Sequence, residues 1–251
     1  MPVEGVYFTP DGKKTFIPLE NNPEVFTTLI HDLGISPKVG FYDVYSLDEP
    51  ALLDLVPRPA LALIFITPSP MYYQVRAEEG TRTAKEHGIT YSGSGADEPV
   101  LWFRQTLGNA CGLYALIHAV ANGGNRRFIE EGSLMDRLIK EAEPLAWEPR
   151  ADVLYKSDEL EEAHMKAARR GDTAPPLDEH PGYHFIAYVK GKDGHLWELE
   201  GDSDGPVDRG LLDDGDDMLS EKALDSGIKR FLKFADGNLE FSIVAMAENA
   251  D

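Results

Sequence analysis

The sequence has a single cysteine among its 251 residues, which excludes a framework of internal disulfide bonds. It also lacks a long apolar run: the longest, residues 60–66, is far shorter than the ~20 residues that a membrane-spanning helix needs. The first five residues, MPVEG, contain neither the basic nor the apolar segment of a secretory signal. We therefore expect a soluble cytoplasmic protein, with the nucleus as an alternative location, that does not associate with membranes.

Basic residues are few relative to acidic ones: 24 lysines and arginines stand against 44 aspartates and glutamates, a formal net charge of −20. Such a surface repels nucleic-acid phosphates and anionic lipids, so we expect no nucleic-acid partner. It would attract a basic protein, although acids that only keep a protein soluble would give the same composition. The hydrophobic content of 42% suffices for the core of one large domain.

Local patterns predict a mixture of helices and strands. The sequence NNPE at residues 21–24 is typical of a helix start, and that helix would end at Gly34. The apolar run, bounded by prolines, predicts a buried strand over residues 60–67. Further helices are expected over residues 49–55, 73–87, 133–142 and 219–234, and further strands over residues 15–20, 41–45 and 239–246. This irregular mixture indicates an α/β or α+β fold.

Two later segments bear on the organisation of the chain. Residues 156–180 are densely charged, lack an apparent apolar stripe and include a proline pair, so we interpret them as a long, mobile surface segment. Residues 183–189 and 195–201 predict a β-hairpin with a five-residue loop over residues 190–194. We find no domain boundary in the pattern.

Cys111 stands at the start of a strongly apolar segment that predicts a buried helix. A lone cysteine is usually a small buried hydrophobe. A helix N-terminus, however, lowers the pKa of a thiol and offers free N–H groups to a developing oxyanion. Gly112 would leave the sulfur accessible. Gln105 would be a second oxyanion donor or, alternatively, a loop residue bonded to the backbone.

A cysteine nucleophile needs a base, and seven histidines are available. We interpret His118, two turns along the Cys111 helix, as a packed structural residue. The predicted hairpin pairs residue 189 with residue 195, which places His184 opposite Glu200 on the same face. An acid facing a histidine fixes its tautomer and stabilises the imidazolium. An inconsequential surface pair would look the same in the sequence.

These residues resemble a known family. The segments QTLGNACG at residues 105–112 and LIHAVAN at residues 116–122 are similar to the active-site motif of the ubiquitin C-terminal hydrolases, a papain-like family of cysteine deubiquitinases. Further similarities occur in order along the chain: PLENNPEV at 18–25, VPRP at 56–59, HFI at 184–186, GHLWELEG at 194–201 and GP at 205–206.

The resemblance implies a role for each candidate. Cys111 would be the nucleophile, His184 the general base and Gln105 the oxyanion-hole side chain. The family usually has aspartate where this sequence has Glu200, which we expect to orient His184 in its place, with Asp202 as the fallback. The implied reaction passes through a thioester and needs neither a metal nor an organic cofactor.

The resemblance also implies a papain-like fold with a central antiparallel sheet between helices and a knotted chain path. Residues 1–251 would form one catalytic domain, with residues 156–180 as a mobile crossover loop over the site. Such a loop favours ubiquitin that carries small or unfolded leaving groups, as in ubiquitin recycling and ubiquitin-dependent protein catabolism. We expect a monomer whose partner is ubiquitin. Acidic residues at 158, 159 and 161 are either ubiquitin contacts or a solvated face.

Two alternatives remain open at this point. The same thiol chemistry could act on another ubiquitin-like modifier, since only the cleft for the tail would differ. A non-catalytic ubiquitin-binding module would arise if glutamate in place of aspartate had disabled the triad. A papain-like amidase of bacterial type is less favoured, because it would not explain the similarities outside the site.

Overall fold

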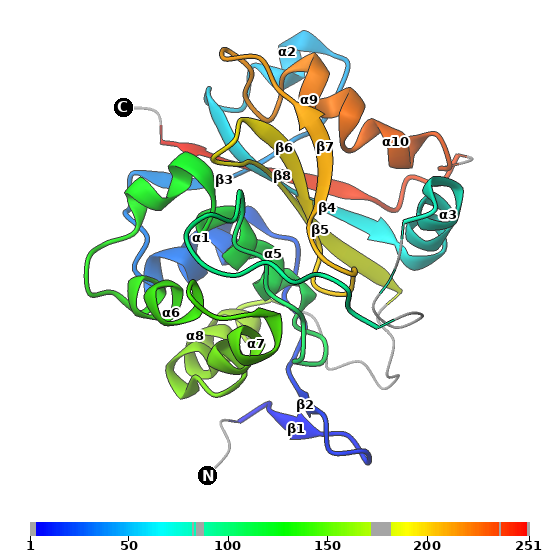
Figure 1. Cartoon of the computed structure of the whole chain (residues 1–251). Coiled ribbons are helices and arrows are strands. Elements are labelled where there is room, and N and C mark those ends of the chain that lie inside the picture. The colour runs from blue at the N-terminus through cyan, green and yellow to red at the C-terminus, as the bar shows by residue number, and fades with distance from the viewer. Residues whose placement is uncertain (1–3, 82, 84–87, 172–181, 236, 250–251) are drawn as a thin grey trace.

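The computed structural model describes residues 4–81, 83, 88–171, 182–235 and 237–249 (Figure 1). Six strands form an antiparallel sheet in the order β3-β8-β4-β5-β6-β7. Their bounds in that order are Val39–Asp43, Ser242–Glu248, Ala60–Pro68, Tyr183–Lys190, His195–Leu199 and Val207–Leu211. A separate ribbon pairs β1 (Tyr7–Phe8) with β2 (Lys14–Thr15).

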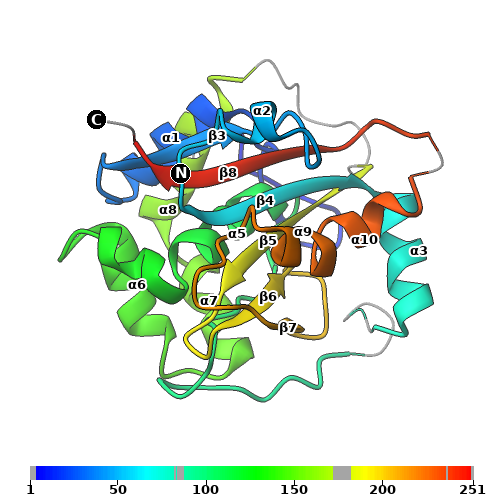
Figure 2. The same ribbon diagram turned by 90° about the horizontal axis from the view of Figure 1, so that it is seen from above.

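Helices cover both faces of the sheet, as the turned view in Figure 2 shows. One face carries α1 (Pro23–Asp32), α5 (Cys111–Val120), α6 (Leu134–Ala142), α7 (Trp147–Tyr155) and α8 (Asp158–Ala168). The other carries α2 (Pro50–Leu53), α3 (Ser69–Glu79), α9 (Glu221–Ser226) and α10 (Lys229–Leu232). A 3₁₀ turn, η1 (Gly123–Phe128), follows α5. The prediction of a central antiparallel sheet flanked by helices is confirmed.

Strand β4 shows how the sequence produces these two layers. Because successive strand residues point to opposite faces, Ala62 and Ile64 join the core beneath α5, while Leu63 and Phe65 join the core beneath α3. A strand buried on both faces needs a continuous apolar run, which is what the sequence has at residues 60–66. Every helix in the described part of the chain is too short or too polar to cross a lipid bilayer.

Helix α1 begins as its sequence predicts. The side chain of Asn22 accepts hydrogen bonds from the backbone N–H groups of Glu24 and Val25, and Pro23 occupies the first helical position. Gly34, with φ of 93°, follows the end of the helix in the left-handed conformation that glycine tolerates best. The expected strand over 60–67 and the expected helix over 133–142 are likewise present, as β4 and α6.

The interpretation of residues 156–180 as a mobile segment is wrong for its first half. Helix α8 spans Asp158–Ala168, and the Ser157 side chain caps it by accepting from the backbone N–H of Leu160. Helix α8 contacts α1, and its buried residues are Leu160, Glu161, His164, Met165, Ala167 and Ala168, a stripe too mixed to be recognised by hydropathy alone. Residues 172–181 of the predicted loop lie outside the described residues.

Several other boundaries differ from those predicted. Glycines account for two of them: Gly227 divides the expected helix over 219–234 into α9 and α10, and Gly80 ends α3 in the left-handed conformation at φ of 63°. In place of the expected strand over 15–20, the structure has the two-residue strand β2, Lys14–Thr15. Helix α7 and strand β7 were not predicted.

The register of the hairpin is also different. Strands β5 and β6 pair Lys190 with Leu196 and Ala187 with Leu199, so each β5 residue faces a position two residues further along β6 than predicted. The cause is a tighter loop, in which Gly191 donates its N–H to the carbonyl of His195. Regular pairing ends before Glu200, so the predicted cross-strand pairing of that residue with His184 is wrong.

Candidate active site

Cys111 is the first residue of α5, as predicted. The preceding turn places Asn109 at φ of 54°, a left-handed conformation that asparagine tolerates better than most residues. The rest of α5 is buried and packs against β5. Next to the cysteine, Gly112 lies against Leu19 and Phe185: an added Cβ would be 3.3 Å from Cβ of Leu19 and 3.4 Å from the Phe185 ring.

The half-buried thiol of Cys111 is not pre-ionised. Burial, reinforced by the negative charge of Glu200, raises its pKa to about 12, although backbone hydrogen bonds from Gly112, Phe185 and Cys111 itself act in the opposite direction. The prediction that the helix start gives a low thiol pKa is therefore wrong for this state, because burial outweighs the backbone donors. The same contacts bring the sulfur beside the strand that carries His184.

His184 lies on β5, directly before Phe185, and its side chain is 14% exposed. Its ring is stacked on Tyr72 with centroids 4.0 Å apart and an interplanar angle of 12°. The ring of Tyr73 approaches the imidazole edge-on at 5.5 Å. Two aromatic rings of α3 therefore fix the plane of the imidazole.

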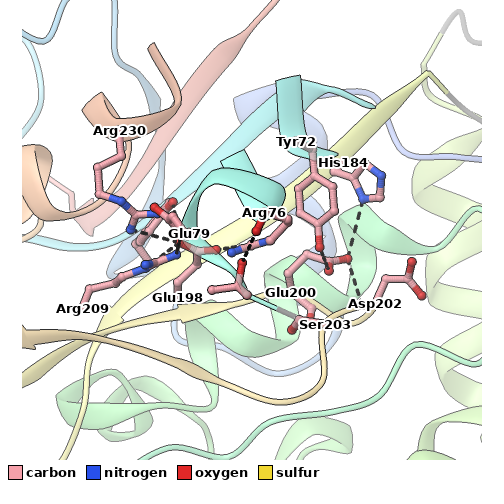
Figure 3. Close-up of polar contacts among 12 residues, drawn as sticks. Tyr72, Arg76, Glu79, His184, Glu198, Glu200, Asp202, Ser203, Arg209 and Arg230 are labelled. Carbon is pink, nitrogen blue, oxygen red and sulfur yellow. Dashed lines mark hydrogen bonds and ion pairs between the residues drawn. The ribbon is translucent and has the colours of Figure 1, made fainter. Parts of the chain in front are cut away.

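Glu200 faces His184 although the predicted register is wrong (Figure 3). The carboxylate is 2% exposed, and its Oε1 lies 3.8 Å from Nδ1 of His184. Oε1 also accepts the backbone N–H of Asp202 at 2.9 Å, and Oε2 accepts the hydroxyl of Tyr72 at 2.8 Å. Burial alone would raise the pKa of this carboxyl, but the nearby His184, with help from Tyr72 and Arg76, lowers the pKa below its usual range.

Asp202, the fallback acid, has another partner. Its Oδ1 accepts a hydrogen bond from Nη1 of Arg104 at 2.8 Å, and its side chain is 29% exposed. It contributes to the site through its backbone, whose N–H fixes Glu200. This arrangement favours Glu200 as the acid that faces His184.

Gln105 stands beside the same corner of the sheet. Its backbone N–H donates to the carbonyl of Gly201 at 2.9 Å, while its side-chain Nε2 donates to the carbonyl of Leu107 at 3.0 Å. The amide is thus bonded to the backbone here, which is the alternative that the sequence left open. The same NH2 group carries a second N–H, which is the donor that could stabilise an oxyanion.

His118 is a structural residue, as predicted. The side chain is fully buried and its Nε2 accepts the backbone N–H of Phe103 at 2.9 Å. Burial lowers its pKa to about 3, so the ring is neutral at neutral pH. Among the described residues, no cluster of three histidine, cysteine or carboxylate side chains has the geometry to hold a metal ion.

Sequence reasoning missed Tyr72, which contacts both His184 and Glu200. The residue belongs to α3, far from the hairpin in sequence and on the opposite face of the sheet from α5. No local pattern predicts such a contact, because hydrophobic periodicity describes one helix or strand at a time.

Comparisons with known proteins agree with one another. Residues 16–233 match the family model described as ubiquitin carboxyl-terminal hydrolase, family 1. A "probable ubiquitin carboxyl-terminal hydrolase" of Dictyostelium discoideum is 36% identical over 76% of this chain and 72% of its own length. A "ubiquitin carboxyl-terminal hydrolase" of Aplysia californica is 35% identical over 88% of this chain and 96% of its own.

Solved structures show the same fold. The catalytic domain of Trichinella spiralis UCH37, in a crystal structure bound to ubiquitin vinyl methyl ester, superposes with a TM-score of 0.68. The match covers 93% of this chain and 95% of that one at 20% sequence identity. The central sheet and its helical layers are therefore shared architecture.

Proposed function

The chain belongs to the ubiquitin carboxyl-terminal hydrolase family 1, and from this we propose that it is a cysteine-dependent deubiquitinase whose nucleophile is Cys111. It would hydrolyse the bond that follows the C-terminal glycine of ubiquitin. The observation that carries the proposal is the junction of α5 with β5. There the chain's only cysteine stands at a helix start, bonded by the backbone of Phe185 and next to the His184–Glu200 pair.

These positions support the following reaction. His184 takes the proton of the Cys111 thiol, and the thiolate attacks the carbonyl carbon of the glycine. The resulting oxyanion is held by the backbone N–H of Cys111 and by the side-chain amide of Gln105, whose NH2 can keep its bond to the Leu107 carbonyl with one N–H and offer the other to the oxyanion. His184 then protonates the leaving amine and afterwards activates water, which hydrolyses the thioester. Glu200 stabilises the imidazolium throughout.

The high thiol pKa has a place in this scheme. A neutral thiol is a poorer nucleophile than a thiolate, so the raised pKa would limit side reactions at the resting site. We propose that the bound ubiquitin tail changes the surroundings of the sulfur and so favours transfer of its proton to His184. A Trichinella relative of the same fold is bound to a ubiquitin derivative, which supports ubiquitin as the partner.

Charge also supports this partner. The tail of ubiquitin is basic, and the net charge of −20 would speed the encounter. Of the acidic residues considered from the sequence as ubiquitin contacts, Glu161 is buried and paired with Lys14, and Glu159 pairs with Arg137 at 2.7 Å.

We propose, on the family resemblance, a cytoplasmic monomer that processes ubiquitin with small or unfolded leaving groups during ubiquitin recycling.

The first experiment is turnover of ubiquitin that carries a fluorogenic C-terminal amide, with the wild type beside Cys111→Ala. Release by the wild type alone supports both the reaction and the nucleophile. Normal release by Cys111→Ala would eliminate the mechanism. Ubiquitin binding without release by the wild type would favour a non-catalytic binding module, and release only from a different ubiquitin-like modifier would redirect the substrate.

A further inference from the structure

One buried side chain contacts both His184 and Glu200. Tyr72 of α3 is fully buried, and its hydroxyl donates to Oε2 of Glu200 at 2.8 Å. Its ring lies parallel to the imidazole of His184, with centroids 4.0 Å apart (Figure 3). The same residue therefore fixes the position of the carboxylate and the plane of the ring that the carboxylate must face.

Glu200 needs such support. Its Oε1 is 3.8 Å from Nδ1 of His184, beyond hydrogen-bond distance, and is already bonded to the backbone N–H of Asp202. Glutamate has one more rotatable bond than the aspartate that the family resemblance implies at this position, so a free carboxylate would leave the imidazole more easily. The Tyr72 hydroxyl bonds the second oxygen, so both oxygens of the Glu200 carboxylate accept a hydrogen bond.

Tyr72 is itself held in place by the next turn of α3. The guanidinium of Arg76 lies 4.7 Å from the centre of the Tyr72 ring and forms an ion pair with Glu198. Both members of this pair are almost completely buried. Nε of Arg209 donates to the other oxygen of Glu198 at 2.9 Å.

The spacing of these residues explains why two contacts form together. Four residues of a helix rise by about 6 Å, and two residues of a strand by about 6.8 Å. A helix that carries Tyr72 and Arg76 one turn apart can therefore meet both Glu198, in β6, and Glu200, which directly follows the strand. The buried ion pair of Arg76 and the hydroxyl bond of Tyr72 therefore hold the same face of α3 at two successive turns.

We propose that Tyr72 is a positioning residue for the reaction of Cys111, acting through its hydroxyl on Glu200 and through its ring on His184. This inference rests on the proposed function and adds to it a residue that acts through Glu200 and His184. When His184 takes the thiol proton, the fixed carboxylate and the tyrosine face both stabilise the imidazolium. Loss of the hydroxyl would release the carboxylate and disfavour that proton transfer.

The test is Tyr72→Phe, which keeps the stacked ring and removes only the hydroxyl. The matched control is Tyr188→Phe, which removes a buried hydroxyl that donates to Glu198 at 3.1 Å but leaves the ion pairs of Glu198 with Arg76 and Arg209 in place. We expect Tyr72→Phe to lower kcat on the ubiquitin amide by about 10- to 100-fold with KM within about twofold, because a hydrogen bond to a charged group is lost. Tyr188→Phe should keep kcat within about twofold.

A second measurement needs no substrate. Because the chain has one cysteine, its alkylation by iodoacetamide at pH 7 reports the thiolate of Cys111 alone. We expect alkylation of Tyr72→Phe to be at least about threefold slower than that of the wild type and of Tyr188→Phe. This difference should persist even if the wild type fails to hydrolyse ubiquitin amides, a result that would overturn the proposed function but not the role of Tyr72.

Other outcomes contradict the inference. Wild-type kcat and alkylation in Tyr72→Phe would overturn it, and so would equal losses in the two variants, since those would report a general loss of packing. If Tyr72→Leu is slow and Tyr72→Phe is not, the ring acts without the hydroxyl, and the proposed bond to Glu200 has no role. Thermal unfolding of each variant shows whether it is folded at the assay temperature.

Discussion

At the residue scale, two acids stand near His184, and their surroundings differ. Glu200 is almost fully buried and directs its carboxylate toward the imidazole, whereas the Asp202 carboxylate is partly exposed and bonded to Arg104. A buried carboxylate held at a low pKa stays ionised at neutral pH and can stabilise an imidazolium. A solvated carboxylate that is paired with arginine has less influence on a ring it does not face.

We therefore expect Glu200→Gln to lower kcat on the ubiquitin amide by about 10- to 100-fold, the loss of a charged interaction of about 1.5–3 kcal/mol. Glutamine keeps the size of the side chain, so the protein should still fold. The control, Asp202→Asn, retains the backbone N–H that bonds Glu200 and should change kcat by less than about twofold. Steady-state kinetics of both variants decide the matter, and the reverse ranking would make Asp202 the orienting acid.

At the element scale, the end of β6 meets the segment that precedes α5. Gly201 lies where these two segments cross, and a Cβ added there would be 2.6 Å from Cβ of Gln105 and 3.0 Å from its backbone nitrogen. Backbone atoms cannot be displaced as cheaply as the end of a flexible side chain. The glycine therefore lets Gln105 approach Glu200 and the start of α5.

Gly201→Ala should destabilise the fold by about 1–3 kcal/mol and also lower kcat, because the added methyl group pushes Gln105 from its position. Gly215→Ala is a suitable control, since a Cβ at that glycine meets no atom within 4 Å. Urea unfolding and steady-state kinetics would be measured on both. Unchanged stability in Gly201→Ala would mean that the two segments separate without cost, contrary to this account.

The same elements show what the sequence could predict. Cys111 at a helix start, and a hairpin that carries His184 and the acid, follow from local patterns and were found. The contact between His184 and Glu200 was also found, but through a register that is wrong by two residues. The tight loop at Gly191 shifts the pairing, and regular pairing stops before Glu200, so the acid meets the imidazole from beyond the end of β6.

Features that depend on packing between distant elements were not predictable in this way. The buried face of α8 contains histidine and glutamate beside leucine, methionine and alanine, so its burial depends on the elements that cover it and not on an apolar stripe of its own. Tyr72 meets Glu200 because an ion pair between Arg76 and Glu198 positions α3 against β6. Neither contact leaves a periodic signal in one segment, since each depends on where a second element lies.

At the scale of the whole molecule, the buried histidines make the fold sensitive to acid. His164 of α8 is fully buried and its Nε2 donates to the carbonyl of Ile17 at 2.7 Å, which leaves Nδ1 without a hydrogen-bond partner. Burial lowers its pKa from the usual 6.5 to about 4. Between these two pH values the unfolded chain binds a proton that the folded protein does not, so acidification through this window favours unfolding.

We expect His164→Gln to weaken this dependence, because glutamine can still donate to the Ile17 carbonyl but does not titrate. A shift of this size corresponds to about 3 kcal/mol of folding free energy lost between pH 6.5 and 4. The wild type should therefore lose about 3 kcal/mol more stability over this pH range than His164→Gln. Urea unfolding at several pH values would measure it. The control is His195→Gln. Asp208 raises the pKa of His195, so the stability that this pair contributes is lost only as the pH rises. The loss of stability on acidification should therefore be the same in His195→Gln as in the wild type. An unchanged acid slope in His164→Gln would mean that His164 is protonated in the folded protein, with water reaching Nδ1.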